Sequence, residues 1–155
     1  MSPELREEIR QNKPFNSLQQ EASLNLYRTS NVVTDSFEQM LKPYGITGTQ
    51  YNVLRILRGA EPRGLCRNEV RDRLLNRMPD ATRLLDRMEE AGLVSRSRDG
   101  EDRRLVSTQL TRQGRRLVDE LDDVVAREHE RRFGHLSEQQ LRTLIKLLTV
   151  VRHPD

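Results

Sequence analysis

The sequence has one cysteine, Cys66, and no tryptophan, and aromatic residues make up only 4% of its 155 residues. A single cysteine excludes an internal disulfide framework and fits a protein kept in the reducing cytoplasm. The uncharged apolar runs are far shorter than the roughly 18 residues that a membrane-spanning helix needs. The first residues, MSPELREEIRQNK, are polar, which argues against a secretory signal. We therefore expect a cytoplasmic protein with no membrane partner.

Lysine is also scarce. Only Lys13, Lys42 and Lys146 are lysines among the 27 basic residues, so the other 24 are arginines, and the 24 acidic residues leave a net charge of +3. This net charge is too small to indicate nucleic-acid binding, so the distribution of the arginines must decide. The hydrophobic fraction of 34% is low enough to suggest disorder. Leucines at helical spacing along most of the chain favour a folded helical protein instead.

Capping boxes predict three helix starts. Ser17, Thr47 and Ser137 each lie three residues before a glutamine, the spacing at which each side chain accepts a hydrogen bond from the other residue's backbone N–H. Apolar residues at intervals of three and four predict helices over about 17–41, 47–58 and 138–152. Thr111 predicts the start of a further long helix, which ends at Gly134.

Two shorter helices and a hairpin are expected between residues 67 and 110. Asn68 is suited to cap the first helix, which carries Val70, Leu74 and Leu75. Pro79 suits the first turn of the next helix, because a missing N–H costs nothing there. Alternating side chains over 93–98 and 105–110, around an Asp-Gly turn at 99–102, predict one β-hairpin.

This order of elements predicts a mainly α fold with a small β-hairpin wing, a winged helix-turn-helix with N- and C-terminal dimerisation helices. The helix at about 78–91 would be the recognition helix, which fits a major groove about 12 Å wide. We expect a polar N-terminal arm over 1–16 and a single winged-helix regulator domain over 17–155. Its dimerisation helices would lie at about 17–41 and 111–152, and its DNA-binding part at about 46–110.

Arginines cluster in the two elements expected to touch DNA. A guanidinium group binds phosphate or guanine with two hydrogen bonds and fits a narrow minor groove. Asp102 would orient the wing by pairing with Arg104 or with a helix. Arginines interleaved with acids are as often a solvated, ion-paired surface, so this alternative stays open for 77–87. The predicted DNA contacts are Arg77, Thr82, Arg83 and Arg87 at the helix and Arg96, Arg98, Arg103 and Arg104 in the hairpin.

Several segments, taken in order, resemble the MarR family of bacterial transcriptional regulators. They are 46–57, 82–89 with Gly92-Leu93-Val94, and Asp102-Arg103-Arg104 followed by Leu110-Thr111-x-x-Gly114. The resemblance covers about 17–152. It implies a homodimer that presents one winged helix to each half of a palindromic operator, and release of DNA by a small ligand or by oxidation. The segment Met78-Pro79-Asp80 departs from the small hydroxyl residues that are usual there.

The terminal helices support the expected homodimer. A final helix with apolar residues on more than one stripe is not expected to stay exposed on a monomer. The resemblance places an effector pocket between the dimerisation helices and the winged helix. Tyr27, Arg28 and Tyr51 would line it, and Arg28 would suit a small aromatic or anionic effector. Ordinary half-buried packing, with the hydroxyl in water, is the favoured interpretation of both tyrosines.

Other functions have weaker support. Cys66 lies near Arg63 and Arg67, which would favour a thiolate and a redox-responsive regulator, but a small residue filling space at a helix start is the favoured interpretation. The histidines lack metal-ligand spacing, and no nucleophile–base pair or glycine-rich phosphate loop is present. We expect no enzyme activity, metal or cofactor. We expect a ligand-responsive repressor that binds double-stranded DNA sequence-specifically, with a winged-helix protein–protein adaptor as the alternative.

Overall fold

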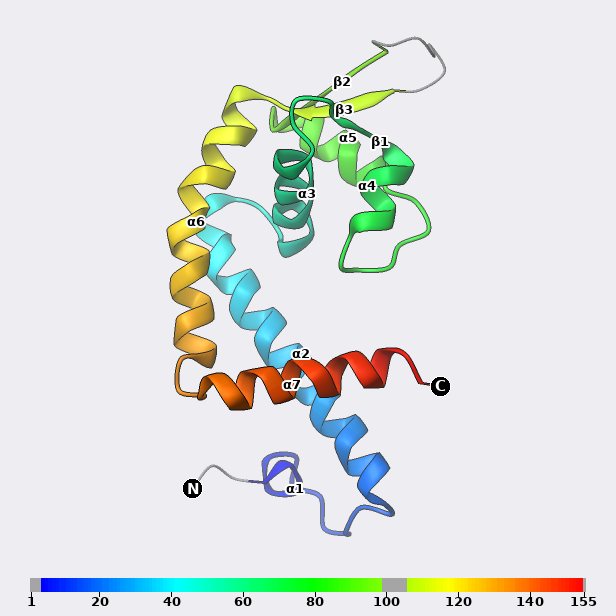
Figure 1. The fold of residues 1–155 in the computed structure, drawn as a ribbon, viewed down its shortest axis with the longest axis vertical. Coiled ribbons are helices and arrows are strands. Elements are labelled where there is room, and N and C mark those ends of the chain that lie inside the picture. The colour runs from blue at the N-terminus through cyan, green and yellow to red at the C-terminus, as the bar shows by residue number, and fades with distance from the viewer. Residues whose placement is uncertain (1–3, 99–105, 155) are drawn as a thin grey trace. The chain divides into compact units, whose positions relative to one another are not determined.

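The computed structural model describes residues 4–98 and 106–154. The chain divides into two compact units, Met1–Pro43 and Tyr44–Asp155, which are described in turn. None of the described helices is long and apolar enough to cross a membrane. The elements in chain order are α1 (Leu5–Glu8), α2 (Leu18–Leu41), η1 (Lys42–Tyr44), α3 (Gly48–Gly59), β1 (Leu65–Cys66), α4 (Arg67–Arg73), α5 (Thr82–Glu90), β2 (Val94–Ser97), β3 (Ser107–Leu110), α6 (Arg112–Phe133) and α7 (Glu138–Arg152) (Figure 1).

The first unit contains α1 and the long helix α2. The helix predicted over 17–41 is confirmed, and the Ser17 hydroxyl accepts the Gln20 N–H at 3.1 Å. The reciprocal half of the predicted box is wrong, because the Gln20 Oε1 accepts the Asn16 N–H at 2.7 Å, one residue further back. The short helix α1 was not predicted, and it lies in the N-terminal arm.

The second unit is a winged helix extended by α6 and α7. Thr47 and Ser137 form complete capping boxes with Gln50 and Gln140, as predicted. The core is apolar because α3, α4, α5 and α6 each turn one stripe inward. Its fully buried side chains include Leu54, Leu57, Val70, Leu85, Met88, Val118 and Leu121.

Two predicted helix starts need correction. Cys66, not Asn68, is the N-cap of α4, because the Glu69 carboxylate accepts the Cys66 N–H at 2.9 Å. The helix α5 begins at Thr82 rather than near Pro79, because Asp80 accepts hydrogen bonds from the Thr82 N–H and hydroxyl at 3.1 and 2.7 Å and fixes the turn there. Since α4 ends at Arg73, Leu75 lies outside the helix and is 87% exposed.

The wing belongs to a three-stranded sheet in the order β1-β3-β2, all antiparallel. The pairing of β2 with β3 confirms the predicted hairpin, whose Asp-Gly turn at 99–102 lies outside the described residues. The prediction of a lone hairpin is wrong, because Leu65 and Cys66 pair with Thr108 and Ser107. A two-residue strand is too short to show a periodicity of its own.

The segment from Thr111 to Gly114 joins the sheet to α6. The Thr111 hydroxyl accepts the Gly114 N–H at 3.0 Å and donates to the Gly92 carbonyl. A Cβ atom on Gly114 would lie 2.0 Å from the Leu93 carbonyl oxygen. Only glycine allows this approach, so the Leu-Thr-x-x-Gly pattern fixes where α6 leaves the sheet.

Candidate nucleic-acid interface

The helix α5 has one buried and one exposed face. Leu85 and Met88 are 1% and 0% exposed, whereas Arg83 and Arg87, one turn apart, point to solvent. Among the described residues, neither arginine has a carboxylate oxygen within 4.0 Å. Because their local charges are not cancelled by ion pairs, these two guanidinium groups remain available to an anionic partner.

The N-terminal end of α5 carries a local polar cluster. Besides the Asp80–Thr82 hydrogen bonds, the Arg67 Nη1 donates to the Thr82 hydroxyl at 3.0 Å, and the Arg67 Nε lies 3.7 Å from the Asp80 Oδ1. Hydrogen bonds from the Thr82 side chain and backbone are the main reason that the pKa of Asp80 is lowered. The negative charge of Asp80 is therefore partly compensated by Arg67, and the hydroxyl of Thr82, a predicted DNA contact, is already engaged.

Arg96 was predicted to contact DNA together with the other hairpin arginines, but its side chain is bound to acids of α5. It lies on β2, and its Nη2 is 2.7 Å from the Asp86 Oδ1 and 2.6 Å from the Glu89 Oε2, both on α5. Its side chain is 26% exposed. Hydrogen bonding to Arg96 lowers the pKa of Glu89. The spacing of three residues between the two acids was the available sequence signal for this contact.

The structure describes only some of the other residues that were predicted to contact DNA or orient the wing. Arg77 lies in the connection before α5, and Arg98 follows β2; both are exposed. Arg103, Arg104 and Asp102 lie outside the described residues. The DNA-contact role of these residues and the wing-orienting role of Asp102 therefore remain predictions.

Comparison with known proteins identifies the family. A sequence model of the MarR family matches residues 44–105. The uncharacterized HTH-type transcriptional regulator YkoM of Bacillus subtilis (strain 168) is 30% identical in an alignment 138 residues long that covers 86% of this chain and 88% of YkoM. The chain belongs to the MarR family. It is thus a MarR-family transcriptional regulator, and the resemblance of its motifs is confirmed.

Solved structures support the same conclusion. A MarR transcription factor from Planctomyces limnophilus is 40% identical, with a TM-score of 0.67 over 88% of this chain and 99% of that one. The transcriptional repressor CouR bound to a 23-mer DNA duplex is 26% identical, with a TM-score of 0.76 over 92% of this chain and 99% of that one. The predicted fold class, a winged helix-turn-helix that is mainly α with a small β wing, is confirmed.

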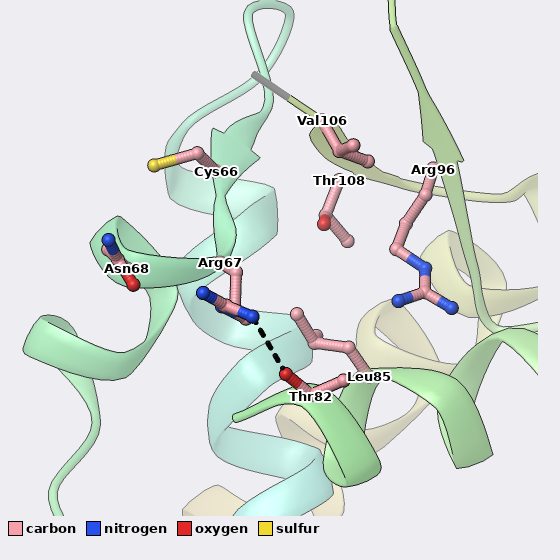
Figure 2. Close-up of a pocket in the computed structure, with 8 residues that line it drawn as sticks. All are labelled: Cys66, Arg67, Asn68, Thr82, Leu85, Arg96, Val106 and Thr108. Carbon is pink, nitrogen blue, oxygen red and sulfur yellow. Dashed lines mark hydrogen bonds between the residues drawn. The ribbon is translucent and has the colours of Figure 1, made fainter. Parts of the chain in front are cut away.

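A pocket of about 390 Å³ lies between α4, α5 and the sheet of this MarR-family chain (Figure 2). The Arg67 and Arg96 side chains lie on either side of it, and Leu85 lies below. The Thr108 residue is 1% exposed, and its hydroxyl has no hydrogen-bond partner among the described residues. A buried hydroxyl without a partner is costly, so a polar ligand or water in this pocket would be stabilised.

The three residues predicted to bind an effector have different surroundings. Tyr27, on α2, is 73% exposed, and the neighbouring Arg28 forms an ion pair with Glu8 at 3.4 Å. Tyr51, on α3, is 6% exposed, and burial raises the pKa of its phenol. The two helices belong to different units, so a common effector site for these residues remains a prediction.

Cys66 is half-buried at the N-cap of α4. This position fits the favoured interpretation of a small residue at a helix start, and the redox-responsive alternative remains untested. Among the described residues, no three His, Cys, Asp or Glu side chains are grouped as metal ligands.

Proposed function

We propose that this MarR-family regulator is a ligand-responsive repressor that binds a palindromic operator as a homodimer. The observation that carries the DNA-binding part is the charge arrangement on α5. Arg96 holds Asp86 and Glu89, so these acids are not left to neutralise Arg83 and Arg87. The helix therefore offers two arginines on its solvent face that form no ion pair among the described residues.

In this proposal each arginine group has a distinct role. Arg83 and Arg87 contact bases or phosphates in the major groove, with Arg77 beside them. Arg98, Arg103 and Arg104 contact the minor groove or phosphates from the wing, and Asp102 orients it. Arg96 acts through α5, because its guanidinium is bound to Asp86 and Glu89. Thr82 similarly supports the start of α5 through Asp80 and Arg67.

Exposed apolar side chains on the terminal helices support the homodimer. On α7, Ile145, Leu147, Val150 and Val151 are 58–64% exposed. On α2, Leu18 and Tyr27 are 80% and 73% exposed. Apolar surface of this extent is stabilised by burial against a partner. A two-fold axis through such an interface would space the recognition helices by about 34 Å, one turn of DNA.

The effector part of the proposal is supported by chemistry and by one neighbour. CouR from Rhodococcus jostii RHA1, 27% identical with a TM-score of 0.74 over 91% of this chain and 98% of that one, is solved with p-coumaroyl-CoA. A small polar effector would fit the pocket beside α5 and would supply a partner for the Thr108 hydroxyl. Because α5 lines this pocket, binding there would act directly on the recognition helix. The alternative is the effector site predicted from the sequence, with Tyr27, Arg28 and Tyr51 as its residues.

The experiment compares two variants of equal charge. The operator is first selected from fragments of the source genome. Arg83→Ala, on α5, should weaken operator binding at least tenfold, in line with about 1–3 kcal/mol for a good arginine–base pair. Arg127→Ala removes an exposed arginine of α6 that has no ion pair among the described residues, and it should change the affinity less than twofold. Equal losses in the two variants, measured by fluorescence anisotropy at fixed salt, would refute the role of α5.

A further inference from the structure

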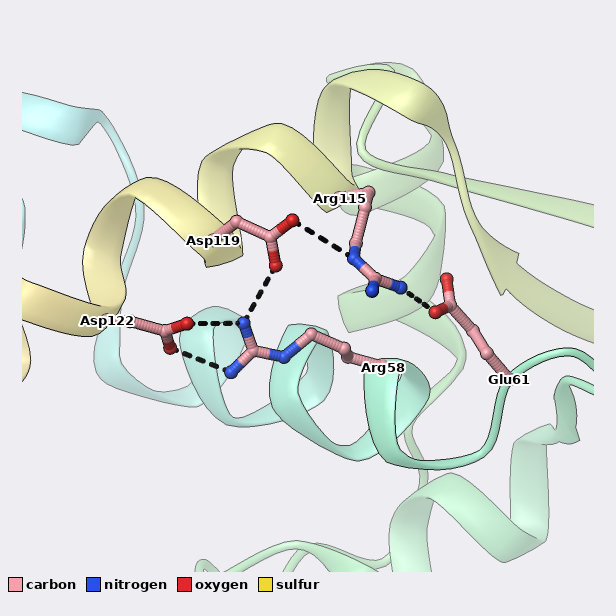
Figure 3. Close-up of polar contacts among 5 residues, drawn as sticks. All are labelled: Arg58, Glu61, Arg115, Asp119 and Asp122. Atoms are coloured by element: carbon pink, nitrogen blue, oxygen red, sulfur yellow. Dashed lines mark hydrogen bonds and ion pairs between the residues drawn. The ribbon is translucent and has the colours of Figure 1, made fainter.

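The helices α3 and α6 are joined by a chain of charged side chains (Figure 3). The Arg58 Nη1 lies 2.9 Å from the Asp119 Oδ1 and 2.9 Å from the Asp122 Oδ2, and its Nη2 lies 2.8 Å from the Asp122 Oδ1. The Arg115 Nε donates to the other Asp119 oxygen at 3.1 Å, and Arg115 also contacts Glu61. One guanidinium from α3 thus binds two carboxylates that lie three residues apart on α6.

This geometry constrains orientation more than it adds stability. Both aspartates are about half exposed, and exposed ion pairs contribute little to the free energy of unfolding. A planar guanidinium that binds one carboxylate through two atoms nevertheless accepts only one relative direction of the two groups. The apolar packing of α3 against α6 has no such directional preference. Arg58 therefore selects one rotation and tilt of α6 on α3.

The tilt matters because α6 connects the winged helix to the exposed apolar helix α7. About eleven residues of α6 follow Asp122, and they extend about 17 Å. A tilt of about 6° would move the far end by about 1.7 Å, and a two-fold axis would double this to about 3.4 Å, the rise of one base pair. A tilt of this size in α6 would thus change the spacing of two recognition helices by a full step along DNA.

We propose that Arg58 is a positioning residue that sets the half-site spacing of the operator, by holding α6 in one orientation on α3 through Asp119 and Asp122. This inference rests on the proposed function, a homodimer on a palindrome. Arg58 does not touch DNA in this account. Its role is to make the homodimer bind one distance between half-sites much more tightly than slightly longer or shorter distances.

The test measures spacing preference rather than affinity alone. Duplexes carry the selected half-site twice, at the selected spacing and at one and two base pairs more or less. The wild-type homodimer should lose at least tenfold in affinity at each changed spacing. In Arg58→Ala and Arg58→Lys, which remove the two-atom contact, the affinities across the five duplexes should converge to within about threefold. The control Arg127→Ala should retain the wild-type profile.

A charge-reversed pair separates positioning from folding. Arg58→Asp combined with Asp122→Arg restores an aspartate–arginine pair across the same helices and should recover part of the spacing preference. If Arg58→Ala lowers affinity equally at every spacing, or only lowers the unfolding midpoint, Arg58 is an ordinary stabilising residue and the inference is wrong. If the wild-type protein shows no preference for the palindromic duplex, the proposed function itself is wrong. The affinities of the wild-type protein alone decide this, without any variant.

Discussion

Arg96 on β2 and Glu89 on α5 are joined by three hydrogen bonds. The Arg96 backbone N–H donates to the Glu89 Oε1 at 3.2 Å, and its Nε and Nη2 donate to the Glu89 Oε2 at 3.0 and 2.6 Å. The same guanidinium reaches Asp86. A strand of the wing and the predicted recognition helix are therefore held as one body, which lets two elements that are proposed to contact DNA keep a fixed relative position.

Removal of this contact should weaken DNA binding without dissociating the proposed homodimer. In Arg96→Ala, the wing strand loses its attachment to α5, and Asp86 and Glu89 become free to repel phosphates and to neutralise Arg83 and Arg87. We expect operator affinity to fall by about tenfold, since charge-assisted hydrogen bonds are the stronger class. Fluorescence anisotropy measures the affinity, and sedimentation velocity checks the dimer. Unchanged affinity would show that α5 and the wing act independently.

The glycine in the Leu-Thr-x-x-Gly pattern should be intolerant of a side chain. In Gly114→Ala, the new Cβ would lie 2.0 Å from the Leu93 carbonyl oxygen, and we expect a loss of about 1–3 kcal/mol or more in the free energy of unfolding. Gly59→Ala is the matched control, because nothing lies within 4 Å of a Cβ there and alanine favours the helix. Urea unfolding distinguishes the two variants. A stable Gly114→Ala protein would contradict this account of the junction.

Much of this architecture was predictable from local signals. Capping residues such as Thr47 and Ser137 predict helix starts, because their hydrogen bonds are made to residues only three positions away in the sequence. The strand β1 and the true start of α5 were not predictable in this way. Leu65 and Cys66 become a strand only by pairing with residues more than 40 positions away. Pro79 and Asp80 each favour a helix start close by, so the sequence alone does not decide where α5 begins.

The candidate site was predicted as a set of residues but not as a set of contacts. Arginine at 83 and 87 on an exposed face follows from helical periodicity. The attachment of Arg96 to α5 and the contact of Arg58 with α6 do not, because ion pairs between distant segments depend on tertiary packing. Composition could not decide which arginines are paired internally and which face solvent.

Acid should remove the stabilising effect of Arg58. Hydrogen bonds from Arg58 lower the pKa of Asp119 and of Asp122 in the folded state. A carboxyl whose folded pKa is lower than its unfolded pKa stabilises the fold above the unfolded value, about 3.9, and this stabilisation is lost as the pH falls through the folded value. The difference in urea midpoint between wild type and Arg58→Ala should therefore be present at pH 7 and shrink toward pH 3. A difference that stays constant with pH would show that Arg58 acts through packing.

The central claim, operator binding by the arginines of α5 and the wing, is tested most directly by the salt dependence of duplex binding. The wild-type protein and its selected operator are titrated by fluorescence anisotropy between 50 and 200 mM salt. A homodimer that neutralises about 6–10 phosphates should lose about 10³–10⁵ in affinity over this range, and Arg83→Ala should bind more weakly throughout. Failure to bind any duplex even at the lowest salt would contradict the account and favour a protein–protein adaptor.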